Sequence, residues 1–192
     1  MITVVSGLPR SGTSLMMQMI VAGGIPALTD GLRTADENNP KGYYEWEPAK
    51  ALKENPDAIA AAEGKVVKII SALLKMLPAS HEYRVVFMRR PLDEVVASQN
   101  KMLARLGREV PSTPQSTVFA AFEKHLNDIQ RWLSMQPNLA VLYVDHTAVL
   151  ECAREEAASI ADFLGGGIDI ERMAAQVERT LHREKRGQVL RP

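Results

Sequence analysis

The chain has 192 residues, and no repeat or linker interrupts it, so we expect residues 1–192 to form a single domain with its own hydrophobic core. Its 23 lysines and arginines balance 23 aspartates and glutamates, and a neutral chain lacks the basic footprint of a general nucleic-acid-binding protein. The lone Cys152 excludes an internal disulfide and favours a reducing compartment, which predicts a cytoplasmic protein. We see neither a signal peptide nor an apolar run long enough to span a bilayer, so no membrane partner is expected.

The first elements predicted are a strand, a turn and a helix. The β-branched run Ile2–Val5 predicts a buried strand of a parallel sheet. A turn rich in glycine, proline and serine follows, and Thr13–Ala22 then shows helical spacing up to the pair Gly23-Gly24. This layout is typical of a phosphate-binding loop, in which backbone N–H groups and a helix N-terminus form an anion site.

The next segment, Pro26–Tyr44, is long and polar, and loops of this length in a compact domain are usually functional or disordered. It leads into Gly42–Pro48, whose aromatic rings and carboxylates we interpret as one wall of a substrate site. Further strands are predicted at Lys65–Ile70, Arg84–Met88 and Leu139–Val144. Helical segments are predicted at about 48–54, 56–63, 71–77, from Pro91 to about Leu106, Gln115–Met135, 146–150, 153–164 and 169–180. In Gln115–Met135 the buried stripe is predicted to be Val118, Phe122, Leu126, Ile129 and Leu133.

Strands that alternate with helices predict an α/β fold of three layers, α/β/α, around a central parallel sheet of about four to five strands, like the P-loop nucleotide-binding folds. Ligands of such sheets bind beyond the carboxyl ends of the strands. We therefore expect the first loop, the residues that close the second strand, Arg89-Arg90 and Asp145-His146 to meet at one edge.

The first loop differs from a nucleoside-triphosphate loop in one residue. Gly7 and Gly12 have the spacing of the Walker A pattern, but Thr13 stands where that pattern has a lysine for the β- and γ-phosphates. The loop retains one cation, Arg10, and several hydroxyl groups. It is therefore better suited to a single 5′-phosphate-type group than to ATP or GTP.

Two motifs in order resemble the sulfotransferase family. Pro9-Arg10-Ser11-Gly12-Thr13-Ser14 is similar to the loop with which that family binds the 5′-phosphosulfate of 3′-phosphoadenosine 5′-phosphosulfate (PAPS). Arg89-Arg90-Pro91 through Ser98 is similar to its 3′-phosphate segment. Weaker similarity over 66–78 and 141–165 extends the resemblance to nearly the whole chain. It implies a P-loop-like fold and transfer of a sulfuryl group from PAPS to a hydroxyl or amine, with 3′-phosphoadenosine 5′-phosphate (PAP) as product.

The resemblance also implies site residues. Pro9, Arg10, Ser11, Gly12, Thr13 and Ser14 would hold the 5′-phosphosulfate, with Arg10 also stabilising charge on the bridging oxygen, and no metal is expected. Arg89, Arg90 and Ser98 would hold the 3′-phosphate. The spacing leaves open which arginine does so, because Arg89 matches the Arg-x-Pro pattern whereas Arg90 lies the expected eight residues before Ser98. A basic tail at 183–187 is vaguely similar to a further phosphate-binding loop of the family. The alternative interpretation is that its charges belong to a solvated chain terminus.

The catalytic base is less apparent. The second predicted strand keeps the family's lysine as Lys68. The animal enzymes of the family have a histidine two residues after this lysine, and this chain does not. Lys68 would contact the transferring group, or else it is a surface lysine at a strand end. Glu45 is the first candidate for the base. Glu47 is the second, although a charge at a helix N-terminus explains it as well. His146 is a minor candidate.

Two other functions remain open. A degenerate P-loop kinase or NTPase would need a Walker B carboxylate, for which only Asp145 is placed. A non-catalytic, PAP-binding relative would explain the absent histidine. The acceptor is expected to be a small molecule, and the aromatic residues at 43, 44 and 46 suggest an apolar or ring-bearing one.

Overall fold

The computed structural model describes residues 1–32, 42–109 and 112–177. Its centre is a sheet of five strands, all parallel, in the order β2-β3-β1-β4-β5. The strands are β1 (Ile2–Gly7), β2 (Ala27–Leu28), β3 (Val66–Lys68), β4 (Tyr83–Arg89) and β5 (Leu139–Asp145). β1 lies in the middle and is buried throughout, as its β-branched sequence predicts.

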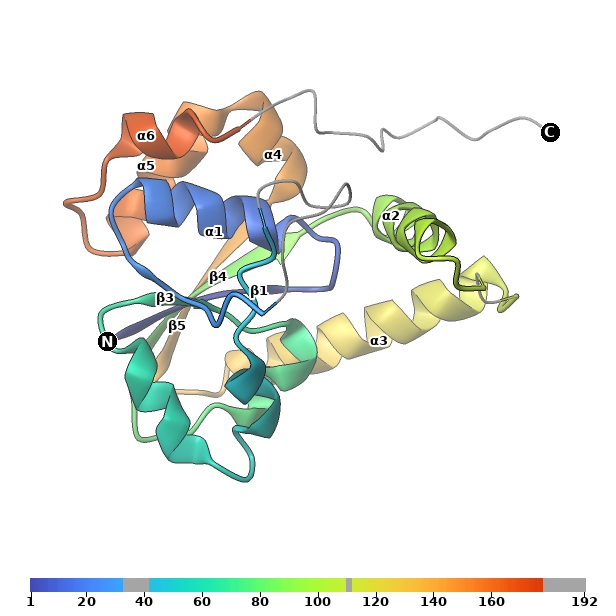
Figure 1. Cartoon of the computed structure of the whole chain (residues 1–192), viewed down its shortest axis with the longest axis horizontal. Coiled ribbons are helices and arrows are strands. Elements are labelled where there is room, and N and C mark those ends of the chain that lie inside the picture. The colour runs from blue at the N-terminus through green and yellow to red at the C-terminus, as the bar shows by residue number, and fades with distance from the viewer. Residues whose placement is uncertain (33–41, 110–111, 178–192) are drawn as a thin grey trace.

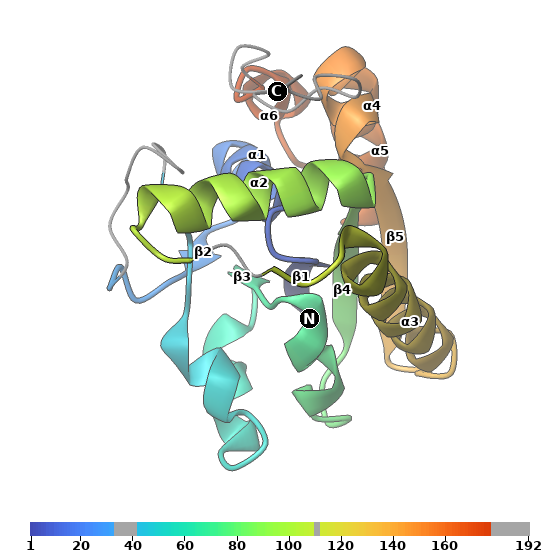
Figure 2. The ribbon, with the colours of Figure 1, turned by 90° about the vertical axis from the view of Figure 1, so that its right-hand side faces the viewer.

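Helices cover both faces of the sheet (Figure 1). One face carries α1 (Thr13–Ala22), α4 (His146–Glu151), α5 (Ala153–Phe163) and α6 (Ile170–Ala174). The other carries α3 (Gln115–Leu133) and three short 3₁₀ helices, η1 (Glu47–Ala51), η2 (Pro56–Ala62) and η3 (Ser71–Met76). The remaining helix, α2 (Leu92–Arg105), lies across the end of the sheet at which the strands finish (Figure 2). The predicted three-layer α/β fold is confirmed.

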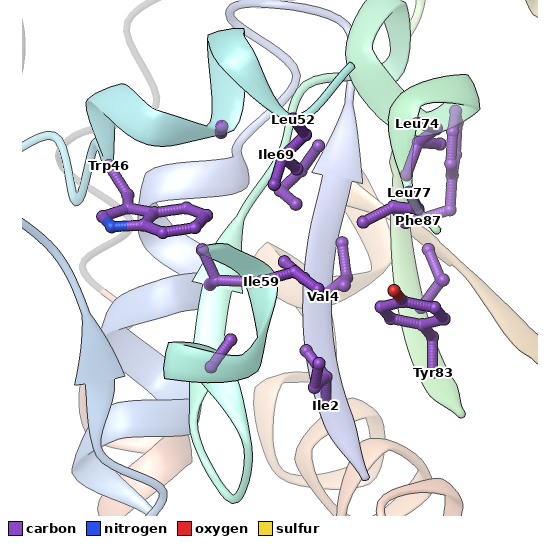
Figure 3. Close-up of a cluster of buried hydrophobic side chains, with 14 of the residues drawn as sticks. Ile2, Val4, Trp46, Leu52, Ile59, Ile69, Leu74, Leu77, Tyr83 and Phe87 are labelled. Carbon is purple, nitrogen blue, oxygen red and sulfur yellow. The ribbon is translucent and has the colours of Figure 1, made fainter. Parts of the chain in front are cut away.

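Alternation along the strands divides the core into two clusters. In β1, Ile2 and Val4 point to the face covered by the 3₁₀ helices, where they meet Trp46, Ile59 and Phe87 (Figure 3). Val5 points to the opposite face and packs with the methionines of α1 and the apolar residues of α5. Burial on both faces fixes the register of β1, because a slip of one residue would exchange the two sets. The position of the loop after β1, relative to the ends of the neighbouring strands, is thereby fixed.

The structure corrects several local predictions. β2 lies in the segment expected to be an irregular loop; its two residues pair with Val66 and Val67. The helical segments predicted at 48–54, 56–63 and 71–77 are short 3₁₀ helices, and two of them begin next to a proline. α6 ends at Ala174, and the part of the predicted helix from residue 178 onward lies outside the described residues.

The predicted stripe of α3 is fully buried only at its end, where Ile129 and Leu133 enter the core. Val118, Phe122 and Leu126 are half-buried. The reason is visible in Figure 1, where the first half of α3 extends beyond the sheet.

Candidate functional site

The loop after β1 has the backbone of an anion cradle. Gly7, Arg10 and Gly12 all have positive φ, at 143°, 71° and 99°, and the Ser11 N–H donates to the Leu8 carbonyl at 3.1 Å. A side chain at position 7 would not fit, since its Cβ would lie 2.5 Å from Ser11 Oγ and 2.7 Å from the carbonyl oxygen of Met88 in β4. The glycines are therefore required by close packing as well as by the turn.

The hydroxyl group of Ser11 is buried in this loop, with no hydrogen-bond partner among the described residues. Ser11 is 1% exposed, and its Oγ forms no hydrogen bond in the part of the chain that the structure describes; the same holds for Ser6 Oγ at the end of β1. Buried hydroxyls are normally hydrogen-bonded. The Ser11 hydroxyl lies just before α1, a helix of ten residues, where N–H groups and the helix dipole favour negative charge. These features fit the phosphate-type group of a ligand such as PAPS.

Of the remaining residues of the predicted loop motif, Thr13 is buried, Ser14 is half-buried and Pro9 is exposed. On the other side of the loop stands His146, the first residue of α4, which is 7% exposed. A Cβ on Gly12 would lie 2.5 Å from His146 Cδ2, so the imidazole packs directly on the loop backbone. His146 thus supports the loop by contact.

Ser98 and Arg90, predicted for a second phosphate, both contact the loop. Arg10 Nε donates to Ser98 Oγ at 3.0 Å, and Arg90 Nη1 donates to the Arg10 carbonyl at 3.1 Å. Arg90 Nε donates to Glu94, in the first turn of α2, at 2.9 Å; the Glu94 side chain is buried and the Arg90 side chain is 9% exposed. Two motifs whose arginines are 80 residues apart in the sequence therefore form one connected cluster.

Arg89 faces a different environment from Arg90. Its side chain is 48% exposed and forms a two-pronged ion pair with Asp145, at 3.0 Å for both hydrogen bonds. The Arg89 guanidinium also lies over the Tyr143 ring at 5.6 Å from its centre. Burial raises the pKa of the Tyr143 phenol, and the nearby Arg89 charge offsets part of that rise. The Arg89 guanidinium is therefore paired with Asp145 and is also half exposed to solvent.

Lys68 is buried at the end of β3, so the interpretation as a surface lysine is wrong. Its ammonium group donates to the Tyr43 carbonyl and lies 3.9 Å from Glu45 Oε1. The Glu45 side chain is 34% exposed. The structure therefore brings together Lys68, predicted to contact the transferring group, and Glu45, predicted as the base. Tyr43 and Trp46, expected in a substrate wall, are instead buried.

Glu47 is exposed and pairs with Lys50 at 2.8 Å. It is the first residue of η1, and its N–H donates to Asp30 at 2.5 Å. That hydrogen bond and one from the Leu32 N–H lower the pKa of the Asp30 carboxyl group. These contacts favour the simpler interpretation of Glu47 as a charge at a helix start.

Two features of the site have no signal in the sequence. Glu94 is buried and holds Arg90, a role that the motif similarity does not assign to it. His125 of α3 meets Ser71, three residues beyond Lys68, with Nε2 and Oγ 2.9 Å apart. Spacing along the chain indicates neither contact. The basic tail predicted at 183–187 lies outside the described residues.

Within residues 1–32, 42–109 and 112–177, no group of three or more histidine, cysteine, aspartate or glutamate side chains is placed to hold a metal ion. In the same ranges, no helix is both long and apolar enough to cross a membrane.

No protein-family model and no curated protein matches the chain. Among solved structures, it is similar to the sulfotransferase domain from the curacin biosynthetic pathway, with 15% sequence identity, 94% of this chain and 88% of that chain covered, and a TM-score of 0.52. A sugar kinase from Janibacter sp. HTCC2649 matches with 15% identity over 84% of this chain and 94% of the kinase, but its TM-score of 0.45 is too low to support an argument. The first similarity supports the fold.

Proposed function

We propose that the chain is a sulfotransferase that moves a sulfuryl group from PAPS to a hydroxyl or amine of a small-molecule acceptor. The observation that carries the proposal is the loop after β1, where the buried Ser11 hydroxyl has no partner among the described residues and Thr13 replaces the triphosphate-binding lysine. The fold that the chain shares with a sulfotransferase domain is consistent with it.

Bound PAPS would supply a sulfuryl group already activated by its link to phosphate. The loop's N–H groups, together with the hydroxyls of Ser11, Thr13 and Ser14, would bind the 5′-phosphosulfate. Arg10 lies on the same loop and would stabilise negative charge on the bridging oxygen as the bond to sulfur breaks. Preorganised donors of this kind need no rearrangement during the reaction, which is the main contribution a protein makes to such a transfer.

On the acceptor side, Glu45 would accept the proton that the acceptor hydroxyl or amine loses. Lys68, 3.9 Å from Glu45 Oε1, would place a positive charge beside the transferring group. The Tyr43 carbonyl holds the Lys68 ammonium, so its position is defined before any ligand binds. Cation and base thus stand together at the end of β3, next to β1 in the sheet.

Isothermal titration of the purified protein with PAP and, separately, with ATP and Mg²⁺ tests the proposal. We expect PAP to bind without Mg²⁺ and to bind more tightly than adenosine 5′-monophosphate, since only PAP has the 3′-phosphate. Binding of ATP with Mg²⁺ but not of PAP would refute the proposal in favour of a kinase or NTPase. A second experiment incubates the protein with PAPS and a panel of phenols, alcohols and amines, and detects the products by mass spectrometry. If PAP binds but the sulfuryl group of PAPS is neither hydrolysed nor transferred, the chain is a non-catalytic PAP-binding protein.

A further inference from the structure

The buried ion pair between Arg90 and Glu94 has no place in the proposed chemistry, although it lies against the loop. The exposed fractions of the two side chains are 9% and 7%, and the bond between Arg90 Nε and Glu94 Oε2 is 2.9 Å long. Burying two charges costs more than most ion pairs return, so such a pair is weak evidence for stability alone. Its role is better sought in its effect on neighbouring residues.

The second contact of Arg90 is with the loop itself. Its Nη1 donates to the main-chain carbonyl of Arg10, 3.1 Å away. Arg10 is one of only two described residues other than glycine with a positive φ, at 71°, a conformation unfavourable for a residue with a Cβ. A strained residue keeps its conformation only when its surroundings hold it there. The Arg90 guanidinium is a rigid, charged donor that does so.

Glu94 determines where this donor points. Arg90 stands before α2 begins, Glu94 lies in the first turn of α2, and the hydrogen bond from Arg90 Nε to Glu94 Oε2 joins the two side chains. With Nε bound to Glu94, the planar guanidinium directs Nη1 at the loop. The bond from Arg10 Nε to Ser98 Oγ adds a link to the next turn of the same helix. The loop is therefore held by α2 through both its main chain and its side chain.

We propose that Arg90 and Glu94 are positioning residues that set the shape of the 5′-phosphosulfate loop from α2, with Glu94 acting through Arg90. This inference rests on the proposed function for the identity of the ligand. It assigns Arg90 to the loop and leaves the exposed Arg89 as the arginine for a 3′-phosphate. The two roles make different predictions for ligands with and without that phosphate.

The test compares PAP with adenosine 5′-phosphosulfate, which lacks the 3′-phosphate, by isothermal titration. Glu94→Gln removes the charge at constant shape. Because this variant leaves Arg90 buried without its carboxylate, it can unfold. The double variant R90M/E94L, which replaces the pair by apolar groups of similar size, keeps the test usable. Glu171→Gln is the matched control, since it breaks an exposed Arg–Glu pair with Arg154, far from the loop in sequence.

We expect Glu94→Gln and R90M/E94L to weaken both ligands by a similar factor of about tenfold, the loss typical of a hydrogen bond from a charged donor. The control should bind both as the wild type does. A loss confined to PAP would overturn the inference, because it would make Arg90 a direct ligand of the 3′-phosphate. Unchanged affinity for both ligands would also overturn it.

Hydrogen exchange without any ligand separates this inference from the proposed function. If the pair holds the loop, amides of residues 8–14 exchange faster in R90M/E94L than in wild type or in Glu171→Gln, while those of β1 are unchanged. Equal exchange in the loop overturns the inference. If neither nucleotide binds the wild-type protein, the proposed function fails, and the exchange rates alone decide the role of the pair.

Discussion

Replacing Gly12 by alanine perturbs the loop in two separable ways. The φ of 99° is unfavourable for any residue with a Cβ, at a cost of about 1–2 kcal/mol. The new Cβ would also lie 2.5 Å from His146 Cδ2. Since His146 is 7% exposed, the ring has little room to move, and crowding of this kind in a packed interior costs about 1–3 kcal/mol. We expect Gly12→Ala to lower the free energy of unfolding by about 2–5 kcal/mol.

Urea denaturation measures the two contributions. Gly64→Ala is the matched control. Gly64 has a φ of 69°, and no atom of residues 1–32, 42–109 and 112–177 lies within 4 Å of the position that its Cβ would take, so only the backbone cost of about 1–2 kcal/mol applies. The variants His146→Ala and G12A/H146A complete a double-mutant cycle. Removing the ring should relieve the crowding. The loss in free energy of unfolding in G12A/H146A is therefore expected to be smaller than the sum of the losses in the two single variants, by about 1–3 kcal/mol.

The same variants report on the site. Gly12→Ala should weaken PAP binding, because the loop must shift to accept the methyl group, whereas Gly64→Ala should bind PAP as the wild type does. If Gly12→Ala costs no more stability than Gly64→Ala, the close contact with His146 does not constrain the loop. An additive cycle would refute the role given to the His146 ring.

Three further changes test other parts of the molecule. Glu45→Gln should abolish sulfuryl transfer and leave PAP affinity intact; unchanged turnover would exclude Glu45 as the base. Burial, and to a smaller extent the negative charge of Glu63, raise the pKa of the Tyr83 phenol to about 12. The native state is therefore stabilised by this group below pH 10, and the stabilisation is lost as the pH rises from 10 to 12. Tyr83→Phe should reduce the fall in denaturation midpoint over that range, and an identical fall would contradict the assignment. Asp145→Asn should preserve or increase PAP affinity in titrations, since Arg89 loses a competing partner; weaker PAP binding would contradict this.

The fold was predictable because its signals are local and repeated. β-branched runs, helical spacing and glycine stops located β1, β4, β5 and the main α-helices to within about two residues. β2 was not predictable, because two residues carry no periodicity and are a strand only through pairing with β3. The 3₁₀ segments were predicted as helical but not as 3₁₀, a distinction that depends on the packing of short turns.

The sequence predicted which residues lie at the functional edge of the sheet, but not which of their side chains contact one another. Parallel topology alone places Arg10, Lys68, Arg89 and Asp145 at one edge, and the register of β4 and β5 sets Arg89 opposite Asp145. Which side chains then contact each other depends on rotamers and on the path of α2. The carboxylate partner of each arginine, Asp145 for Arg89 and Glu94 for Arg90, follows from that geometry.

The environment of Asp145 bears on the choice between phosphoryl and sulfuryl transfer. A Walker B carboxylate must be available to the Mg²⁺ that accompanies a nucleoside triphosphate. Here both oxygens of Asp145 accept hydrogen bonds from Arg89, and the next residue, His146, is buried against Gly12. Arg89 therefore neutralises Asp145, the carboxylate that the sequence offered for a Walker B role. A sulfuryl group carries less negative charge than a phosphoryl group, so the proposed sulfuryl transfer would need less positive charge from the protein than phosphoryl transfer would.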